Sequence, residues 1–507
     1  MSGLGRTRSV SLVGLTGHLI EVEAHLAASV PSFALVGLPD ASLAESRDRV
    51  RAAIHSTGIG WPQRRITVNL SPASLPKSGS GFDLAIAVAT MAGAGVIPVG
   101  TVADVVHLGE LGLDGRLHPV RGVLPAVAAA VAAGRERVVV PAGNAAEARL
   151  VPGAQIVGAS SLAEVLASYG AEVAVPDLPG VASPASAAPP ALPDLADVLG
   201  QRTARWALEV AAAGGHHLFL VGPPGTGKTM LAARLPSLLP DLDDRDAVEV
   251  TAIHSVAGTF DPGGGLVRRP PFEDPHHTAT PASVVGGGSG MPRPGAASRA
   301  HRGVLFMDEA PEFSSAVLQT LRQPLERGEL VLHRAAGTAR YPARFQLVLA
   351  ANPCPCGRGW GKGLDCTCTP LARRRYFSRL SGPLLDRIDL QVDVLPPTRA
   401  DRHQGAGEAS AVVGERVATA RARAAARWAG SQWRTNAEVP GATLRARGIP
   451  GQAELERAMD RGLLTMRGAD RVLRIAWTLA DLAGVSRPTG AEVSQALLLR
   501  TRSAGVR

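Results

Sequence analysis

Apolar and polar positions alternate along this chain in short blocks that predict an α/β protein. Short apolar runs rich in Val, Leu and Ile, bounded by Gly, Pro or charged residues, are typical of buried strands. Runs rich in alanine with leucine are typical of buried helices. The runs that predict strands are 9–13, 66–70, 138–141, 217–221, 303–307 and 345–351, and those that predict helices are 84–89, 124–133 and 202–213.

A change in composition divides the chain into domains. Residues 173–193 are rich in Pro, Ala, Ser and Gly and hold too few large apolar side chains for a core, so we expect a flexible linker there. On either side of it we expect an α/β domain, over 1–172 and over 194–397. Residues 398–507 carry apolar positions at helical spacing and predict a helical domain.

One stretch in the second domain, 222–229, reads Gly-Pro-Pro-Gly-Thr-Gly-Lys-Thr and matches the phosphate-binding pattern G-x-x-x-x-G-K-[ST] in full. A predicted strand precedes it and a run suited to a helix follows it, which is the context that this P-loop motif requires. Its backbone N–H groups would curl around phosphates. Lys228 would reach the β- and γ-phosphates, and Thr229 would hold Mg²⁺. The other predicted nucleotide-binding residues are Gly222, Pro223, Pro224, Gly225, Thr226 and Gly227.

Two further strands end in polar side chains that suit a nucleotide site. Asp308 and Glu309 follow the strand 303–307. Asp308 would bind Mg²⁺ through water, and Glu309 would polarise the water that attacks the γ-phosphate. Asn352 stands at the tip of the strand 345–351, where it would sense the γ-phosphate or position the water. The alternative for Asn352 is a turn former before Pro353.

Arginines beyond these strands can complete such a site. Arg387, after a short helical segment, could be offered to the γ-phosphate of a neighbouring subunit, with Arg379 as the competing candidate. Arg471 and Arg474 are one helical turn apart and share a face. We expect one of them to contact the phosphates from the helical domain and favour Arg474. A solvated helix face is the alternative for the other.

All four cysteines of the chain fall in one glycine-rich loop over 354–368, as two C-x-C pairs. Four thiolates can close a tetrahedral Zn²⁺ shell, and a reducing cytosol disfavours two disulfides. Because C-x-C is tighter than the usual C-x₂-C, redox-active or unpaired thiols remain the alternative. We predict a structural zinc site that would make the loop rigid. Its ligands would be Cys354, Cys356, Cys366 and Cys368.

Charge and hydropathy narrow the partners and the compartment. The net charge is +9 and the sequence pI about 10.2, which favours a polyanionic partner such as nucleic acid, although a codon bias toward arginine would give the same balance. We find no apolar run long enough to span a bilayer and no signal-peptide h-region. We therefore expect a cytoplasmic protein that does not contact a membrane.

Two patches of the first domain, 75–84 and 108–122, resemble the proteolytic domain of Lon-type proteases, which use a Ser–Lys dyad. The position of the serine falls on Gly81, and no lysine follows Gly122. We therefore predict a non-catalytic domain and reject peptidase activity. Lys77 and Ser78 are interpreted as a surface turn.

With these elements in this order, the chain resembles the AAA+ superfamily, and more narrowly its magnesium-chelatase-like branch called YifB or ComM. The resemblance implies an AAA+ P-loop ATPase core with ATP and Mg²⁺, a Lon-protease-like (ribosomal S5 domain 2-like) N-terminal α/β domain and a C-terminal helical lid. It also implies hexameric rings. The segments that carry the resemblance are 33–40, 212–216, 275–278, 300–306, 351–357 and 381–389.

The best understood type of member is a DNA helicase that promotes branch migration during natural transformation. The resemblance therefore implies an ATP-dependent, hexameric motor on recombination intermediates. The alternative is a chelatase-type motor that remodels a protein partner. The complete P-loop argues against a non-enzymatic DNA-binding or zinc-scaffold module.

The expected DNA partner is branched or single-stranded and bound with low sequence specificity, because aromatic residues for base stacking make up only 4% of the chain. In ring ATPases of this type, the hairpin 333–340 and the segment 260–302 would face the channel. His276 and His277 are interpreted as a packed or capping pair rather than as metal ligands. The basic side chains of this segment are Arg268, Arg269, His276, His277, Arg293, Arg299 and Arg302.

Overall fold

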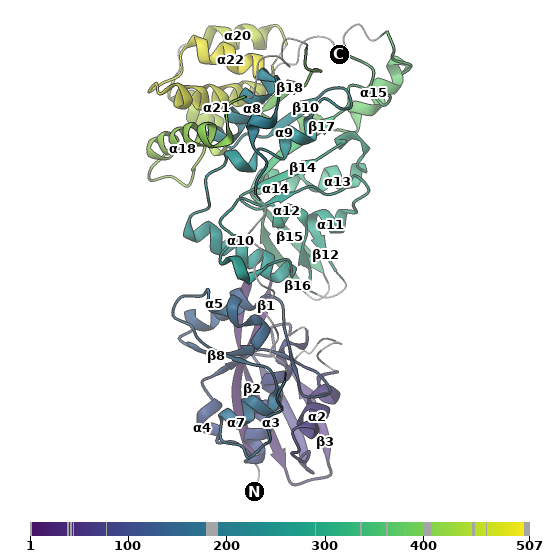
Figure 1. Ribbon diagram of the computed structural model, residues 1–507, viewed down its shortest axis with the longest axis vertical. Coiled ribbons are helices and arrows are strands. Elements are labelled where there is room, and N and C mark those ends of the chain that lie inside the picture. The colour runs from purple at the N-terminus through teal and green to yellow at the C-terminus, as the bar shows by residue number, and fades with distance from the viewer. Residues whose placement is uncertain are drawn as a thin grey trace.

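Two α/β units and a helical domain follow one another along the 507-residue chain (Figure 1). The computed structural model describes residues 3–37, 40, 43, 45–77, 79–178, 191–288, 291–334, 337–360, 364–380, 382–398, 407–448, 452–462 and 464–500. Positions 179–190 of the predicted linker and Ser78 lie outside these residues. Within them, no helix is both long enough and apolar enough to cross a bilayer.

The first unit is built on a seven-stranded mixed sheet in the order β3-β4-β2-β1-β5-β8-β9. Every second residue of β2 from Ile20 to Leu26 is buried, as a sheet with one covered face requires. The predicted strands and helices of this unit are confirmed. The strands are β1 Gly3–Val13, β2 Thr16–Ala27, β3 Ser32–Val36, β4 Arg65–Ser71, β5 Val106–His107, β8 Arg137–Pro141 and β9 Gln155–Ala159, with a small ribbon of β6 Glu110–Leu111 and β7 Leu117–His118. The helices are α2 Ser46–Ser56, α3 Asp83–Ala94, α4 Val99–Val102, α5 Val123–Ala132, α6 Ala145–Ala148 and α7 Leu162–Ser168.

Lys77 does not lie on a surface turn, and that prediction is wrong. Its side chain is fully buried, and its ammonium donates to the carbonyl of Pro72. Its own carbonyl accepts from the backbone N–H of Asp40, 3.1 Å away. A lysine can be buried when its ammonium finds such a partner, and the Gly- and Ser-rich sequence around it gives no sign of that partner.

The second unit is built on a five-stranded parallel sheet in the order β11-β14-β17-β10-β18. β10, β14 and β17 are buried along their whole length, which is why they read as continuous apolar runs. The strands of the sheet are β10 Leu218–Val221, β11 Phe272–Glu273, β14 Val304–Met307, β17 Gln346–Ala351 and β18 Leu390–Asp393.

Helices and two hairpins surround this sheet (Figure 1). The predicted helix 202–213 is confirmed as α8. The helices are α8 Arg202–Gly214, α9 Lys228–Ala232, α10 Asp244–Ala257, α11 Pro281–Val285, α12 Ala296–Arg299, α13 Ser315–Thr320, α14 Arg322–Arg327, α15 Pro370–Ser378 and α16 Gly382–Leu385. The hairpins pair β12 Gly286–Gly287 with β13 Arg293–Pro294, and β15 Glu329–Arg334 with β16 Gly337–Pro342.

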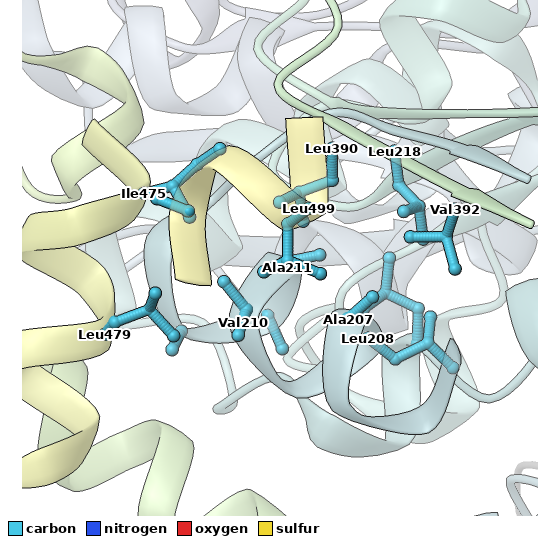
Figure 2. Packing of buried hydrophobic residues seen from close by; sticks show 14 of the residues in the cluster. Ala207, Leu208, Val210, Ala211, Leu218, Leu390, Val392, Ile475, Leu479 and Leu499 are labelled. Atoms are coloured by element: carbon cyan, nitrogen blue, oxygen red, sulfur yellow. The ribbon is translucent and has the colours of Figure 1, made fainter. Parts of the chain in front are cut away.

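The C-terminal residues are helical where the structure describes them. Their helices are α18 Ser410–Arg427, α19 Gly441–Ala446, α20 Gln452–Asp460, α21 Met466–Ala483 and α22 Gly490–Arg500. They share one hydrophobic core with the parallel sheet. Figure 2 shows Ile475 and Leu479 of α21 and Leu499 of α22 beside side chains of α8, β10 and β18. The helical domain is therefore packed onto the same side of the sheet as α8.

Two arginines of α18 make ion pairs within the chain. Arg416 makes two-pronged contacts with Glu209 and Glu408. Arg427 donates to the buried carboxylate of Asp481 at 2.9 Å and lies over the ring of Trp477, 4.5 Å from its centroid. Arg416 therefore joins α18 to α8 of the second unit, and Arg427 joins it to α21.

The first and second units touch through α5 and α10 (Figure 1). The backbone N–H of Gly122, before α5, donates to the carbonyl of Ser255 in α10 at 3.2 Å. The hydroxyl of Ser255 donates to the carboxylate of Glu147. The hairpin predicted at 333–340 is confirmed as β15–β16, and its buried side chains pack against Leu15 of the first unit. The tip of this hairpin, 335–336, lies outside the described residues.

Candidate nucleotide site

The predicted nucleotide residues meet at one edge of the parallel sheet. β10 lies between β17 and β18, two strands that come later in the chain. This makes its carboxyl end a switch point of the kind where α/β sheets bind ligands. The P-loop follows β10, Asp308 and Glu309 follow β14, and Asn352 follows β17. Because parallel strands share a direction, all three segments leave the sheet at the same edge.

The P-loop needs its glycines. Gly225 and Gly227 have φ angles of +77° and +87°, in the left-handed region that favours glycine. A Cβ on Gly222 would lie 2.1 Å from the carbonyl oxygen of Val394, which follows β18. The sequence therefore folds this loop tightly against the sheet, with its backbone turned as the motif predicts.

The ammonium of Lys228 is nearly buried and has three oxygen partners. Nζ lies 2.7 Å from the carbonyl oxygen of Gly222, 2.9 Å from that of Pro223 and 3.2 Å from Oδ1 of Asn352. Burial lowers the pKa of Lys228, while the carboxylates of Asp308 and Glu309 raise it. The site thus holds a cation where the motif places the phosphates, and Asn352 faces that cation from the neighbouring strand.

Thr229 and Asp308 form the second contact across the site. The Thr229 hydroxyl donates to Oδ2 of Asp308 at 2.6 Å, and the other carboxylate oxygen accepts from the backbone N–H of Glu309 at 2.8 Å. A hydroxyl and a carboxylate are the hard oxygen ligands that Mg²⁺ prefers. The pair therefore fits the predicted Mg²⁺ site.

Glu309 has a strained backbone and a partner that sequence reasoning missed. Its φ and ψ are 49° and 42°, a left-handed conformation that is uncommon for a residue with a side chain. Its Oε2 lies 3.4 Å from Nδ1 of His277, which comes from the segment after β11. The rings of His276 and His277 pack with centroids 4.1 Å apart, as predicted. Only the three-dimensional arrangement brings His277 to the carboxylate, because no spacing in the sequence connects them.

The two candidate finger arginines are placed differently. Arg387 bonds with the carboxylate of Glu326 and the carbonyl of Pro383, and only 15% of its side chain is exposed. Arg379 is 51% exposed and donates to Glu312, 3.1 Å away. These contacts within one chain do not test whether either arginine reaches the γ-phosphate of a neighbouring subunit, so both finger assignments stay predictions.

The two candidate lid arginines contact other residues of their own chain. Arg471 lies 2.7 Å from the buried carboxylate of Asp389. Nε of Arg474 donates to the carbonyl of Val439 at 2.8 Å, and burial lowers the pKa of Arg474 to about 10. A phosphate contact by either residue stays a prediction.

The four cysteines come together after β17. All four sulfur atoms lie within 4.8 Å of one another, and each cysteine is a free thiol. Cys354 is fully buried. The arrangement is compatible with a metal ion.

Several of the predicted DNA-binding arginines are already paired with carboxylates. Arg268 pairs with Asp244 at 2.7 Å, and Arg299 donates two hydrogen bonds to the carboxylate of Glu273. Arg302 lies 3.3 Å from Asp246. Their charge is therefore used within the chain, which the charge count of the sequence could not reveal.

Comparison with known proteins identifies the family. The sequence profile of "Magnesium chelatase, subunit ChlI" matches residues 194–402. The profiles of "Subunit ChlI of Mg-chelatase" and of its "C-terminal" part match 22–144 and 407–500. YifB of Escherichia coli is 40% identical over 93% of this chain and 92% of its own length. The competence protein ComM of Haemophilus influenzae is 38% identical over 96% and 95%.

The chain belongs to the YifB/ComM family of magnesium-chelatase-like AAA+ proteins. The uncharacterized protein Rv2897c of Mycobacterium tuberculosis is 52% identical over 99% of both chains. The resemblance to this family that the sequence motifs predicted is thereby confirmed. Membership of this AAA+ family suggests ATPase activity, which agrees with the geometry of the P-loop and of Asp308.

The contact between His277 and Glu309 generates the first prediction. A carboxylate oxygen that faces a histidine is less free to accept a hydrogen bond from the attacking water, so His277→Ala should raise the rate of ATP hydrolysis measured without any partner. Because both side chains are partly exposed, the pair is worth at most about 1 kcal/mol, and the rate should rise by at most about fivefold. Steady-state phosphate release measures this rate.

His276→Ala is the matched control, because the Nδ1 of His276 bonds with Thr278 and not with Glu309. Its rate should equal that of the unmodified chain. An unchanged or lower rate for His277→Ala would contradict the restraining role of this histidine.

Proposed function

We propose that this chain is an ATP-hydrolysing motor that acts on DNA, working as a ring of six copies that drives branch migration of recombination intermediates. The observation that carries the ATPase part is the meeting of Lys228, Asn352 and the bonded pair Thr229–Asp308 at one sheet edge. The resemblance to helicases of the ComM type supports DNA as the substrate and natural transformation as the process.

The residues of the chain divide the proposed hydrolysis between them. The P-loop backbone binds the β- and γ-phosphates of ATP, and Lys228 exchanges its carbonyl partners for phosphate oxygens. Thr229 and Asp308 hold Mg²⁺. Glu309 activates the attacking water, and Asn352 positions that water or senses the γ-phosphate.

A neighbouring copy would complete the site. We propose that Arg387 leaves Glu326 and stabilises the charge on the γ-phosphate of the next subunit, with Arg379 as the competing finger. Arg474, with Arg471 as its competitor, would reach the phosphates from the helical lid. Closure of the lid onto bound ATP would then be linked to ring assembly.

The proposed DNA contacts are four exposed arginines of the second unit. Among the described residues, no ion pair is recorded for Arg293, Arg334, Arg374 or Arg375, and all four are exposed. Arg374 and Arg375 lie on α15, at the end of the molecule away from the first unit (Figure 1). Contacts of this type read the phosphate backbone and carry little sequence preference.

The proposed motor is tested with purified protein on a synthetic four-way DNA junction. We expect the junction to stimulate ATP hydrolysis and strands to exchange. Lys228→Ala should lose ATP binding. Glu309→Gln should keep ATP binding but lower hydrolysis by about 10²–10⁴-fold, the usual contribution of a general base. Both variants should lose strand exchange.

The same assay separates the alternative, a chelatase-type motor that remodels a protein partner. The support for this alternative is that magnesium-chelatase profiles match most of the chain. A chelatase-type motor and a DNA motor would share the same ATPase core. Robust hydrolysis that is indifferent to every DNA tested, yet lost in Lys228→Ala, would leave the nucleotide site standing and overturn the DNA assignment.

The exposed arginines give a separate prediction about DNA affinity. Arg334→Ala and Arg374→Ala should each weaken binding to single-stranded oligonucleotides about equally across sequences. Each should also reduce the slope of log K against log salt by about 1, since one phosphate contact is lost. Fluorescence anisotropy at several salt concentrations measures both quantities.

Arg51→Ala is the control for this series. Arg51 is an exposed arginine on α2, in the first unit and far from α15 (Figure 1). It should leave affinity and slope unchanged. Equal effects of all three variants would indicate a general charge effect and contradict the proposed contacts.

A further inference from the structure

We infer that the four cysteines bind one Zn²⁺ ion and that this ion fixes the loop after Asn352 against the P-loop, so that zinc occupancy controls ATP turnover. The effect on turnover rests on the proposed ATPase, whereas zinc binding does not. The inference stands on the geometry of the sulfur atoms and on the contacts of the cysteine loop, residues 354–368, which the structure describes at 354–360 and 364–368.

The sulfur atoms are spaced for a tetrahedral metal. Cys354 Sγ lies 3.3 Å from that of Cys356 and 3.6 Å from that of Cys366, and the last two lie 3.6 Å apart. Zinc–sulfur bonds of about 2.3 Å place the sulfurs of a tetrahedral site about 3.8 Å apart. A disulfide needs about 2.05 Å. The sulfur of Cys368 lies within 4.8 Å of the other three, so all four can reach one ion.

Four sulfur ligands leave no open coordination position. A closed site of this kind has a structural and not a catalytic role. The ion would join residues 354–356 to residues 366–368 and close the loop at its base. Zinc is the metal that this set of soft ligands and this geometry favour in the presence of the common divalent ions.

The closed loop is in contact with the nucleotide site on two sides. Gly357 has a φ of +75°, and a Cβ there would lie 2.6 Å from Cγ of Pro224 in the P-loop. The buried Cys354 is two residues from Asn352, whose side chain meets Lys228. The cysteine loop therefore bears on both the P-loop and the predicted sensor.

The far end of the cysteine loop leads into α15, whose Tyr376 lies near Asn352. Thr369, directly after Cys368, caps α15 by accepting from the backbone N–H of Ala372 at 3.2 Å. Tyr376 of this helix is buried, which raises the pKa of its hydroxyl to about 12, while the nearby backbone of Asn352 lowers it. Zinc would thus hold a loop that begins two residues after Asn352 and leads into the helix that carries Tyr376. Without it, Asn352 would lose a rigid support while the P-loop itself stays intact.

The metal site is tested first by measuring the metal content of the full chain, purified without a histidine tag. We expect about one zinc per chain by plasma mass spectrometry. Chelation followed by cobalt(II) should give the absorption spectrum of a tetrahedral thiolate complex, which needs no variant. A metal-free chain with four reactive thiols, or one with two disulfides, would overturn the site.

The effect on turnover is tested with Cys356→Ser/Cys368→Ser, and Thr367→Ala is the matched control. Thr367 is exposed and lies between the last two cysteines, so the control should keep its zinc and its activity. The double variant should lose zinc and show about tenfold lower kcat, because Asn352 is misplaced. Its affinity for an ATP analogue should stay within about twofold, since Lys228 and its loop carbonyls remain.

The outcomes separate the two parts of the inference. Loss of zinc with unchanged kcat would overturn the control of turnover, and so would an equal loss of kcat and of nucleotide affinity, which indicates unfolding. If the unmodified chain hydrolyses no ATP, the proposed function fails, and the zinc content still decides the metal site.

Discussion

The buried ammonium of Lys228 is the interaction on which the nucleotide site depends. A cation taken out of water destabilises a fold unless oxygen atoms surround it. Here the carbonyls of Gly222 and Pro223 do so from the loop itself, and Asn352 does so from the next strand. The loop can turn its carbonyls inward only because glycines accept left-handed backbone. Asn352 can reach the ammonium only because β17 lies beside β10 and runs parallel to it.

The helical lid is tied to the parallel sheet by buried polar contacts at the amino ends of β10 and β18, the edge opposite the nucleotide site. Asp389 is fully buried next to Arg471 of the helical lid and His216 before β10. Although burial opposes it, Arg471 and His216 hold the pKa of Asp389 well below its usual range. Asp389 is two residues from Arg387, so the segment that carries the proposed finger is attached to the lid. The contact between the second unit and the first is made by α10. The lid is therefore joined to the segment that carries the proposed finger, and the first unit is joined to α10.

The elements of the fold and the members of the site were predictable where the signal is local. The P-loop, Asp308 and Asn352 are each marked by the end of an apolar strand, and the structure brings them together. The predictions that failed concern contacts between distant segments. Lys77 reads as a turn residue but is buried, with its ammonium on the carbonyl of Pro72. The partner of Glu309, His277, carries no spacing signal at all.

The account's central claim is that the ammonium of Lys228 is held ready for phosphate by oxygens that it gives up on binding. An experimental structure of the chain with Mg²⁺ and a non-hydrolysable ATP analogue tests this most directly. We predict that Lys228 Nζ leaves the carbonyls of Gly222 and Pro223 and bonds with β- and γ-phosphate oxygens, with Mg²⁺ between Thr229 and Asp308. An analogue bound elsewhere, with Lys228 still on its loop carbonyls and on Asn352, would contradict the account.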